Sequence, residues 1–427
     1  MKNNLPLLQD ADLKGKIVLV RVDHNVVKSG LIHDPYRIDS TFGTISYILA
    51  NGGKPILMTH VGRPKDKATN NIIINEKTSV QPIVNYLKEK LQLRIEVPEF
   101  CQYENQGYLS IDTSINHLIK KLENNKIDMI YLPNTRWFLG EEAKGENQDR
   151  FAYQLAGLAD IYVNDAFGSW QAHASTVGVN KFLPSYAGFL MQKEIQNLEK
   201  LFNAEKPLLA VVAGSKFDTK INSLSALIKR ADKLIIGGVL YNAYLCAKYD
   251  ITIKGIDEED IKLAKEFYEF SKQYPNKIVE LPYIIESETI EGKYDGKFKT
   301  IDIRELKAKT KLGFVLDAAQ ESFKEKEVEN AFMQAKTIFV NAVMGFTPHF
   351  NDGTIAMDSL IDKNKEALKL YGGGDTLQEL KQLLPGIYLS ALDNPKYYMF
   401  TGGGAVLKAI EEETPNGIPP IQELLKI

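Results

Sequence analysis

The hydrophobic positions of this chain fall into short blocks rather than into one continuous pattern. Apolar runs of the kind that form strands buried on both faces occupy residues 16–22, 55–60, 126–132 and 161–165. Stretches with helical spacing of apolar positions separate these runs, at residues 37–50, 79–91 and 148–158. Strands that alternate with helices in this way predict a parallel sheet covered by helices.

The second half of the chain repeats the alternation. Strands are predicted at residues 208–213, 233–237, 278–281, 337–341, 368–372 and 398–401, and helices at residues 220–231, 258–274 and 377–384. A chain of 427 residues is long enough for two hydrophobic cores. We therefore predict an α/β fold with two doubly wound, parallel-sheet (Rossmann-like) domains joined by a hinge helix.

The predicted domain boundary lies in the Leu-Pro-Ser-Tyr-Ala-Gly stretch at residues 183–188. A helix predicted from Phe189 to about Phe202 comes next and is placed to join the domains. We expect an N-terminal domain over residues 1–185, an inter-domain helix over residues 186–205 and a C-terminal domain over residues 206–405. We expect the C-terminal segment, residues 406–427, to pack back on the first domain.

Polar and basic side chains follow the carboxyl ends of the predicted strands in the first half. In chain order they are Asp23, Asn25, Arg37, His60, Arg63, Arg136 and His173. Ligands of doubly wound sheets bind at this edge. Lysine is the usual cation here, yet six of the eight arginines lie in the first 150 residues, which favours a bidentate anion site. Taken alone, His173 is read more simply as a helix cap or a core histidine, and Arg21 as a strand residue paired with a nearby carboxylate.

Glycine clusters directly follow two predicted strands of the second half. Gly373, Gly374, Asp375 and Thr376 precede one predicted helix, and residues 402–404 are three glycines before another. Such turns let a backbone approach phosphate, although ordinary strand–helix turns also use glycine. Lys216 and Lys220 lie four residues apart at a predicted helix start, where the helix dipole disfavours cations, so a phosphate-binding role is indicated. The sequence has neither a Walker-type loop nor a dinucleotide-binding glycine fingerprint.

Composition gives no indication of a nucleic-acid-binding or membrane protein. Hydrophobic residues make up 44% and charged residues 25%, with a net charge of −3, so nothing indicates a nucleic-acid partner. The sequence has no run of 18 apolar residues and no apolar signal core, so we expect no membrane partner. Its two cysteines, Cys101 and Cys246, lie far apart and fit a reducing cytoplasm.

Together these segments resemble phosphoglycerate kinase. Residues 20–26 (VRVDHNV) and 58–64 (MTHVGRP) are similar to two motifs of that family, as are residues 164–168 (NDAFG) and 172–178 (AHASTVG). Residues 214–220 (GSKFDTK), the GGGDT run from Gly372 and the TGGGA run from Thr401 are similar to its second-half motifs. These similarities occur in the same order as in the family and span nearly the whole chain.

The resemblance implies a kinase of glycolysis that transfers a phosphoryl group reversibly between 1,3-bisphosphoglycerate with ADP and 3-phosphoglycerate with ATP. It implies small-molecule substrates, Mg2+ with the nucleotide, and a monomer. Asp23, Asn25, Arg37, His60, Arg63, Arg136 and His173 would bind substrate. Lys216, Lys220, Asn341, Gly373, Gly374, Asp375 and Thr376 would bind nucleotide, with Asp375 at the metal. Arg37, Lys216 and Gly374 would be catalytic.

Several positions depart from the family pattern. Gln171 stands where a substrate-phosphate arginine is usual, and Pro348 stands where a ribose-binding glutamate is usual. A neutral amide cannot replace the charge of a guanidinium group. Two alternatives therefore stay open: a family member with altered acyl-phosphate or nucleotide specificity, and a non-catalytic nucleotide-binding scaffold.

Overall fold

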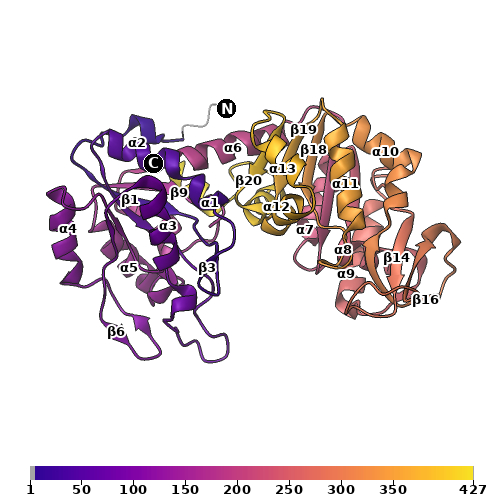
Figure 1. Ribbon diagram of the computed structural model, residues 1–427, viewed down its shortest axis with the longest axis horizontal. Coiled ribbons are helices and arrows are strands. Elements are labelled where there is room, and N and C mark those ends of the chain that lie inside the picture. The colour runs from indigo at the N-terminus through magenta and orange to yellow at the C-terminus, as the bar shows by residue number, and fades with distance from the viewer. Residues whose placement is uncertain (1–4, 427) are drawn as a thin grey trace. The chain divides into compact units, whose positions relative to one another are not determined.

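The structure, a computed structural model, describes residues 5–426 of the chain. The chain divides into two compact units: unit 1 comprises Met1–Gln196 and Asn416–Ile427, and unit 2 comprises Asn197–Pro415. The main sheet of each unit is entirely parallel and is flanked by helices (Figure 1). The predicted α/β class with two parallel sheets is confirmed.

Unit 1 is built on a six-stranded parallel sheet with the order β10-β9-β1-β4-β8-β5. These strands are β1 (Ile17–Val22), β4 (Lys54–Met58), β5 (Ile95–Glu96), β8 (Met129–Tyr131), β9 (Ile161–Asp165) and β10 (Ser185–Ala187). Short hairpins are formed by β2 (Val27–Lys28) with β3 (Leu31–Ile32) and by β6 (Gln102–Tyr103) with β7 (Gly107–Tyr108). The helices are α1 (Tyr36–Asp39), α2 (Phe42–Ala50), α3 (Gln81–Leu91), α4 (Asn116–Glu123), α5 (Glu146–Ala156) and α15 (Pro419–Leu424).

Strand β1 lies in the middle of this sheet and explains its continuous apolar run. It pairs with β4 on one side and β9 on the other, and both of its faces are covered. Val18 and Val20 belong to one hydrophobic cluster, whereas Leu19 belongs to another. Because side chains alternate along a strand, Arg21 shares the face of Leu19, and it is fully buried. A buried arginine in a central strand requires polar partners, which the site supplies.

The helix predicted over residues 37–50 is divided in the structure. Helix α1 ends at Asp39 and α2 begins at Phe42. The hydroxyl of Ser40 donates to the carbonyl of Tyr36, and the hydroxyl of Thr41 donates to the carbonyl of Ile38 at 2.8 Å. Hydroxyl side chains that bond to nearby carbonyls in this way compete with helical backbone bonds, which accounts for the break.

Unit 2 is built on a five-stranded parallel sheet with the order β12-β11-β18-β19-β20. These strands are β11 (Leu208–Gly214), β12 (Lys233–Gly237), β18 (Thr337–Asn341), β19 (Leu368–Gly372) and β20 (Tyr397–Phe400). The helices are α7 (Ile221–Arg230), α8 (Gly238–Tyr249), α9 (Glu258–Ser271), α10 (Lys326–Met333), α11 (Asp352–Lys363), α12 (Gly374–Leu383), α13 (Pro385–Leu392) and α14 (Gly403–Glu411).

A second, antiparallel sheet in unit 2 was not predicted. It has the order β15-β14-β17 and consists of β14 (Tyr283–Ser287), β15 (Phe298–Asp302) and β17 (Phe314–Ala318). A smaller parallel pair joins β13 (Thr252–Ile253) and β16 (Lys311–Leu312). The strand predicted at residues 278–281 is wrong, because Ile278 forms only an isolated bridge to Leu234 and the next strand begins at Tyr283. Pro282 follows directly and removes a backbone donor at that point.

Helix α6 (Phe189–Phe202) begins in unit 1 and ends in unit 2. Two side chains of unit 1 satisfy its first N–H groups: the Thr44 hydroxyl accepts from Phe189 at 2.9 Å, and the Asp165 carboxylate accepts from Met191 at 3.1 Å. Burial raises the pKa of Asp165 to about 6. The helix start is therefore fixed to strand β9 and helix α2.

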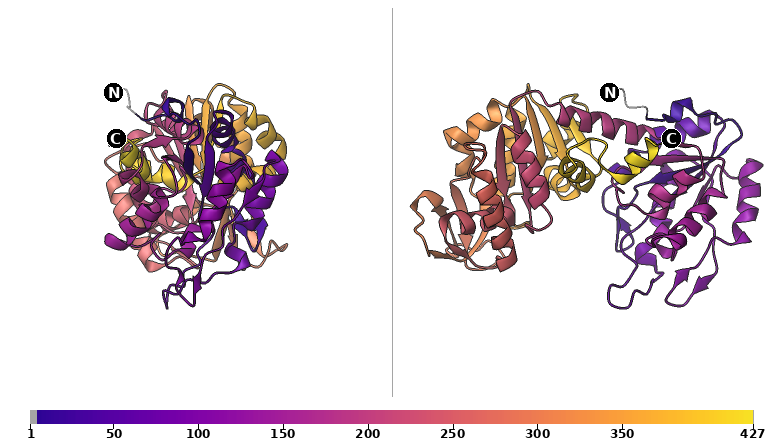
Figure 2. Two further views of the ribbon diagram at one scale, coloured as in Figure 1. Left: turned by 90° about the vertical axis from the view of Figure 1, so that its left-hand side faces the viewer. Right: turned by 180° about the vertical axis from the view of Figure 1, so that it is seen from behind.

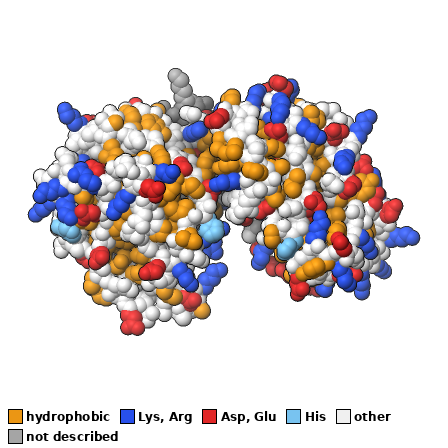
Figure 3. Space-filling model, in the orientation of Figure 1, with side chains coloured by type: hydrophobic (Ala, Val, Ile, Leu, Met, Phe, Trp, Pro, Cys, Tyr) orange, Lys and Arg blue, Asp and Glu red, His pale blue; other side chains and the backbone are white. Residues whose placement is uncertain are grey.

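The C-terminal helix α15 belongs to unit 1, where it contacts β10 and the turn Ala174–Gly178, and Figure 2 shows it against that unit. Its residues Ile421 and Leu424 are fully buried. Among residues 5–426, no helix is both long enough and apolar enough to cross a membrane. On the face drawn in Figure 3, basic and acidic side chains are interspersed over both units.

Candidate functional site

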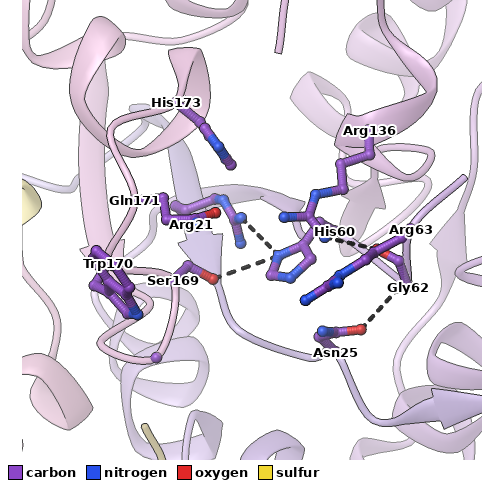
Figure 4. A pocket seen from close by; sticks show the side chains of 11 residues that line it. Arg21, Asn25, His60, Gly62, Arg63, Arg136, Ser169, Trp170, Gln171 and His173 are labelled. Atoms are coloured by element: carbon purple, nitrogen blue, oxygen red, sulfur yellow. Dashed lines mark hydrogen bonds between the residues drawn. The ribbon is translucent and has the colours of Figure 1, made fainter. Parts of the chain in front are cut away.

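A pocket of about 370 Å³ lies at the carboxyl ends of the strands in unit 1 (Figure 4). The parallel register places Arg21 beside Met58 on β4 and beside Asn164 on β9, so the loops after these strands meet. The pocket is lined by Arg21, Asn25, His60, Gly62, Arg63, Arg136, Gly168, Ser169, Trp170, Gln171 and His173. Three arginines in one concave site make an anion the ligand that fits best.

Five of the predicted substrate residues line this pocket, namely Asn25, His60, Arg63, Arg136 and His173. Asp23 and Arg37 do not line it, but they form an ion pair with each other at 3.2 Å, with Asp23 buried and Arg37 partly exposed. The second carboxylate oxygen of Asp23, Oδ1, is buried and has no hydrogen-bond partner within residues 5–426. That oxygen is an acceptor left for a hydroxyl group.

The turn after β4 positions two of the pocket arginines. Gly62 has a φ of +59°, a conformation that other residues rarely adopt, and its N–H donates to Oδ1 of Asn25 at 2.8 Å. Its carbonyl accepts from Nη1 of Arg136 at 2.7 Å, and Nε of Arg136 forms an ion pair with Glu142 at 2.7 Å. Burial lowers the pKa of Arg136, with Glu142 acting in the opposite direction. Arg63, the next residue, is exposed at the pocket edge.

The pocket wall also contains Arg21, which the sequence interpretation missed. Its Nη2 donates to Nδ1 of His60 at 3.1 Å, and its Nε donates to the Ser175 hydroxyl at 2.8 Å. The expected direct pairing with a carboxylate is wrong: within the described chain, the carboxylate of Glu141 is reached only through Ser175. Burial lowers the pKa of His60 well below its ordinary value, and the charge of Arg21 lowers it further.

His173 both caps a helical turn and lines the pocket, two roles that the sequence did not distinguish. It is the N-cap residue of the turn Ala174–Gly178, where its N–H donates to the Thr176 hydroxyl at 2.9 Å. It also lines the pocket, and burial lowers its pKa. Gln171 is exposed in the same wall. Lys181 does not line the pocket, because its ammonium group pairs with Asp149 at 2.5 Å.

In unit 2 the ends of β11, β18, β19 and β20 bring Lys220, Asn341 and the two glycine turns together. Lys220, just before α7, donates to the side-chain oxygen of Asn341 at the end of β18. The amide of Asn341 in turn donates to the carbonyl of Gly372 at 2.6 Å. Burial lowers the pKa of Lys220 to about 8, while the charge of Asp375 acts in the opposite direction. Lys216 and Asp375 are exposed.

The two glycine turns of unit 2 lie against each other. A Cβ added at Gly403 would lie 2.4 Å from Cα of Gly373, a distance that side chains do not tolerate. Gly373 has a φ of +116°, and a Cβ there would lie 2.9 Å from Nδ2 of Asn341. Gly374, Asp375 and Thr376 form the first turn of α12, whose backbone N–H groups are free of helical partners. This backbone edge can bind phosphate oxygens.

A narrow cavity of about 20 Å³ near this edge was also missed. It is bordered by Gly237, Gly238, Tyr241, Asn242, Ile284, Val315, Leu316, Asp317, Ala318 and Met344. Burial raises the pKa of Asp317 to about 7. The signal available was the pair of glycines at the end of a predicted strand, Gly237 and Gly238, which is similar to the signal that identified the other turns.

Within the described part of the chain, no three His, Cys, Asp or Glu side chains gather as a metal site. An exposed carboxylate such as that of Asp375 fits a hard cation that takes its other oxygen ligands from phosphates and water.

Comparison with known proteins gives one consistent result. The family model described as phosphoglycerate kinase matches residues 8–413. The chain is 33% identical to a phosphoglycerate kinase of Dictyoglomus turgidum, over 97% of this chain and 98% of that protein, and 34% identical to one of Finegoldia magna, over 98% and 100%. Among solved structures it is similar to phosphoglycerate kinase of Coxiella burnetii, with a TM-score of 0.71, 26% identity and 98% of both chains covered. The phosphoglycerate kinase of Pyrococcus horikoshii shares the fold, with a TM-score of 0.77 at 22% identity over 98% of both chains.

Proposed function

The chain belongs to the phosphoglycerate kinase family and is a kinase of glycolysis, and from this premise we propose how its two units divide the reaction. Unit 1 binds 3-phosphoglycerate or 1,3-bisphosphoglycerate, and unit 2 binds ATP or ADP. The basic pocket of unit 1 supports the first assignment, and the paired glycine turns with Lys216 and Lys220 support the second.

In unit 1, Arg63, Arg136, His60 and His173 bind the anionic groups of the substrate from the pocket wall. Asn25 keeps the Gly62 turn in place through its side-chain oxygen. Asp23, which has one buried oxygen without a partner, accepts the substrate hydroxyl, and Arg37 is held beside it by their ion pair. Arg37 then stabilises the carboxyl phosphate during transfer.

In unit 2, the N–H groups of Gly373, Gly374, Asp375 and Thr376 and the ammonium group of Lys220 bind nucleotide phosphates, with Asn341 fixing Lys220. Asp375 supplies an oxygen ligand for Mg2+, which neutralises phosphate charge when bound. Lys216 stabilises the charge on the transferring group, and Gly374 contributes a backbone N–H to it.

The chemistry requires positioning and charge stabilisation more than proton transfer. The acceptor carboxylate of 3-phosphoglycerate is already ionised near neutral pH, so no general base is needed. The cations of both sites oppose the negative charge that spreads over the transferring phosphoryl oxygens. Exclusion of water prevents hydrolysis and strengthens these interactions.

The single observation that carries the substrate assignment is the pocket formed by Arg21, Arg63 and Arg136 around a histidine. A coupled assay of the purified protein with 3-phosphoglycerate and MgATP tests it, and we expect turnover. Folded protein that binds nucleotide but gives no turnover would contradict the assignment.

Gln171 favours one variation of this function. Its neutral side chain lies in the pocket wall where the family has an arginine, so a weaker hold on the substrate phosphate, or preference for another acyl phosphate, follows naturally. An assay against a panel of acyl phosphates separates the two. We further propose a cytoplasmic protein, which is supported by two free cysteines, and a monomer, which the resemblance to the family implies.

A further inference from the structure

The pocket of unit 1 rests on a buried chain of hydrogen bonds that ends at a carboxylate. Arg21 is fully buried, and three of its nitrogen atoms have protein acceptors: the carbonyl of Val22, the Ser175 hydroxyl and Nδ1 of His60. Ser175 is also fully buried, and its hydroxyl donates to Oε1 of Glu141 at 2.6 Å. The chain therefore runs from Glu141 through Ser175 and Arg21 to His60.

The direction of each bond in this chain is fixed by chemistry. A guanidinium group has only donors, so Nδ1 of His60 must be the acceptor of the 3.1 Å bond from Arg21. The Ser169 hydroxyl, 3.5 Å from the same nitrogen, is also able to donate to it. A neutral imidazole with an accepting Nδ1 carries its proton on Nε2. Figure 4 shows both contacts reaching the same ring nitrogen.

Glu141 is the buried carboxylate at the end of this chain of hydrogen bonds. Its side chain is fully buried, and its second oxygen, Oε2, accepts the backbone N–H of Ser175 at 3.0 Å. Because the Glu141 carboxylate can only accept, the Ser175 hydroxyl must be the donor in their hydrogen bond. The remaining lone pairs of that hydroxyl oxygen then face Arg21 as acceptors. Glu141 also balances a buried guanidinium charge that has no direct carboxylate partner within residues 5–426.

The charged groups around His60 favour the same state. Burial lowers its pKa well below the ordinary value, and Arg21, Arg136, His173 and Arg37 all act in the same direction. The largest charge effects on that pKa come from these basic groups and not from a carboxylate. The ring therefore adds a hydrogen-bond donor to a strongly basic pocket without adding another positive charge.

We propose that Glu141 and Ser175 are positioning residues for phosphoryl transfer, which act through Arg21 to hold His60 as the neutral Nε2–H tautomer and so present a fixed N–H donor to the anionic substrate. This inference rests on the proposed substrate role of the unit 1 pocket. Neither residue needs to touch the substrate, because both act on the orientation and protonation of a residue that lines the pocket.

The first test measures the tautomer in the free, full-length protein. Long-range proton–nitrogen correlation spectra of the ¹⁵N-labelled protein distinguish protonated from unprotonated ring nitrogens, and with six histidines the spectrum is tractable. The His60 signals are those that disappear in His60→Asn. We expect an unprotonated Nδ1 and a protonated Nε2 at neutral pH. A protonated Nδ1 in the wild-type protein would overturn the proposal.

The second test uses Ser175→Ala, which removes a single hydroxyl, and Glu141→Gln, which removes the charge with little change in shape. We expect both to populate a second protonation state of His60. We also expect both to raise KM for 3-phosphoglycerate about tenfold, the size of roughly one lost hydrogen bond, with kcat changed less than about threefold. Ser185→Ala is the matched control, because Ser185 is equally buried in unit 1 and donates instead to the carbonyl of Leu183.

The outcomes separate this inference from the function on which it rests. A wild-type protein that turns over 3-phosphoglycerate but has a protonated Nδ1 refutes only the positioning role. Variants whose His60 spectrum and KM match those of Ser185→Ala refute it as well. Absence of turnover in the wild-type protein refutes the proposed function, whatever the tautomer.

Discussion

The two candidate sites offer different groups to a phosphate. The pocket of unit 1 is formed by side chains, among them three arginines and a histidine, and Arg21, Arg136 and His60 are held by hydrogen bonds. The edge of unit 2 is formed largely by backbone, where two glycine turns lie in contact and Lys220 supplies positive charge. A site made of side chains can be tuned one residue at a time, whereas a site made of close backbone turns tolerates little change.

The largest expected effect tests whether unit 2 contains a catalytic charge as well as a binding edge. Lys216→Ala should lower kcat about 10²–10³-fold while nucleotide affinity changes far less, because the contact strengthens in the transition state. Steady-state kinetics and calorimetric titration with ADP measure the two quantities. Lys229→Ala, in helix α7 and paired with Glu413, is the control and should leave both unchanged. A change confined to KM would assign Lys216 to ground-state binding.

The backbone character of unit 2 predicts the next largest effect. Gly403→Ala should lower the free energy of unfolding by about 3 kcal/mol and weaken nucleotide binding, since its Cβ would lie 2.4 Å from the backbone of Gly373. Chemical denaturation and ADP titration provide the measurements. Gly386→Ala is the opposite case, because an added Cβ there meets nothing within 4 Å, and in helix α13 it should stabilise by about 0.5–1 kcal/mol. Equal effects of the two substitutions would refute the close-contact argument.

Lys220 makes the nucleotide affinity of unit 2 sensitive to alkaline pH. With a pKa lowered to about 8, Lys220 loses its charge as the pH rises past that value, so KM for ATP should rise up to about tenfold per pH unit. Between about pH 8 and the ordinary lysine pKa of about 10.4, the unfolded chain binds more protons than the folded one. Over that range the contribution of Lys220 to stability therefore increases with pH, opposite in sign to its effect on affinity.

Kinetics from pH 7 to 9.5 and parallel unfolding curves measure these two trends. Lys220→Arg keeps its charge throughout this range and should abolish the rise in KM. A wild-type KM that does not change with pH would show that the ammonium group contributes no charge to binding.

The smallest expected effect concerns the side-chain site of unit 1. Gln171→Arg should lower KM for 3-phosphoglycerate about three- to tenfold, because it adds a guanidinium group to the pocket wall. Lys181 does not supply this charge, since it pairs with Asp149 outside the pocket. Gln106→Arg adds the same charge at an exposed position that does not line the pocket and should leave KM unchanged. If both variants tighten binding equally, the effect is long-range attraction rather than contact.

Much of the fold could be predicted because buried parallel strands have continuous apolar runs. The bounds of β9, β12, β18 and β19 agree with the sequence prediction at both ends. The sheet of β14, β15 and β17 was missed, because β15 is only half covered and lacks such a run. The break between α1 and α2 depends on two hydroxyl groups whose local hydrogen bonds a hydrophobic pattern does not reveal.

The sequence could predict those residues of the candidate site that directly follow the ends of strands. His60, Arg63 and Arg136 follow strands that are neighbours in the sheet, so their meeting follows from topology. Arg21 was misread because its partner Ser175 lies 154 residues away, and no local pattern connects them. The pairing of Asp23 with Arg37 likewise depends on the geometry of the loop between them.

Helix α15 has a consequence for synthesis of the chain. Ile418, Ile421 and Leu424 fill part of the core of unit 1, although all of unit 2 is translated before them. Unit 2 is contiguous in the sequence and can therefore fold as soon as it leaves the ribosome. Unit 1 keeps an exposed apolar surface until helix α15 has been synthesised. For this protein the first unit to be translated is the last to be completed, and its aggregation hazard is greatest during that interval.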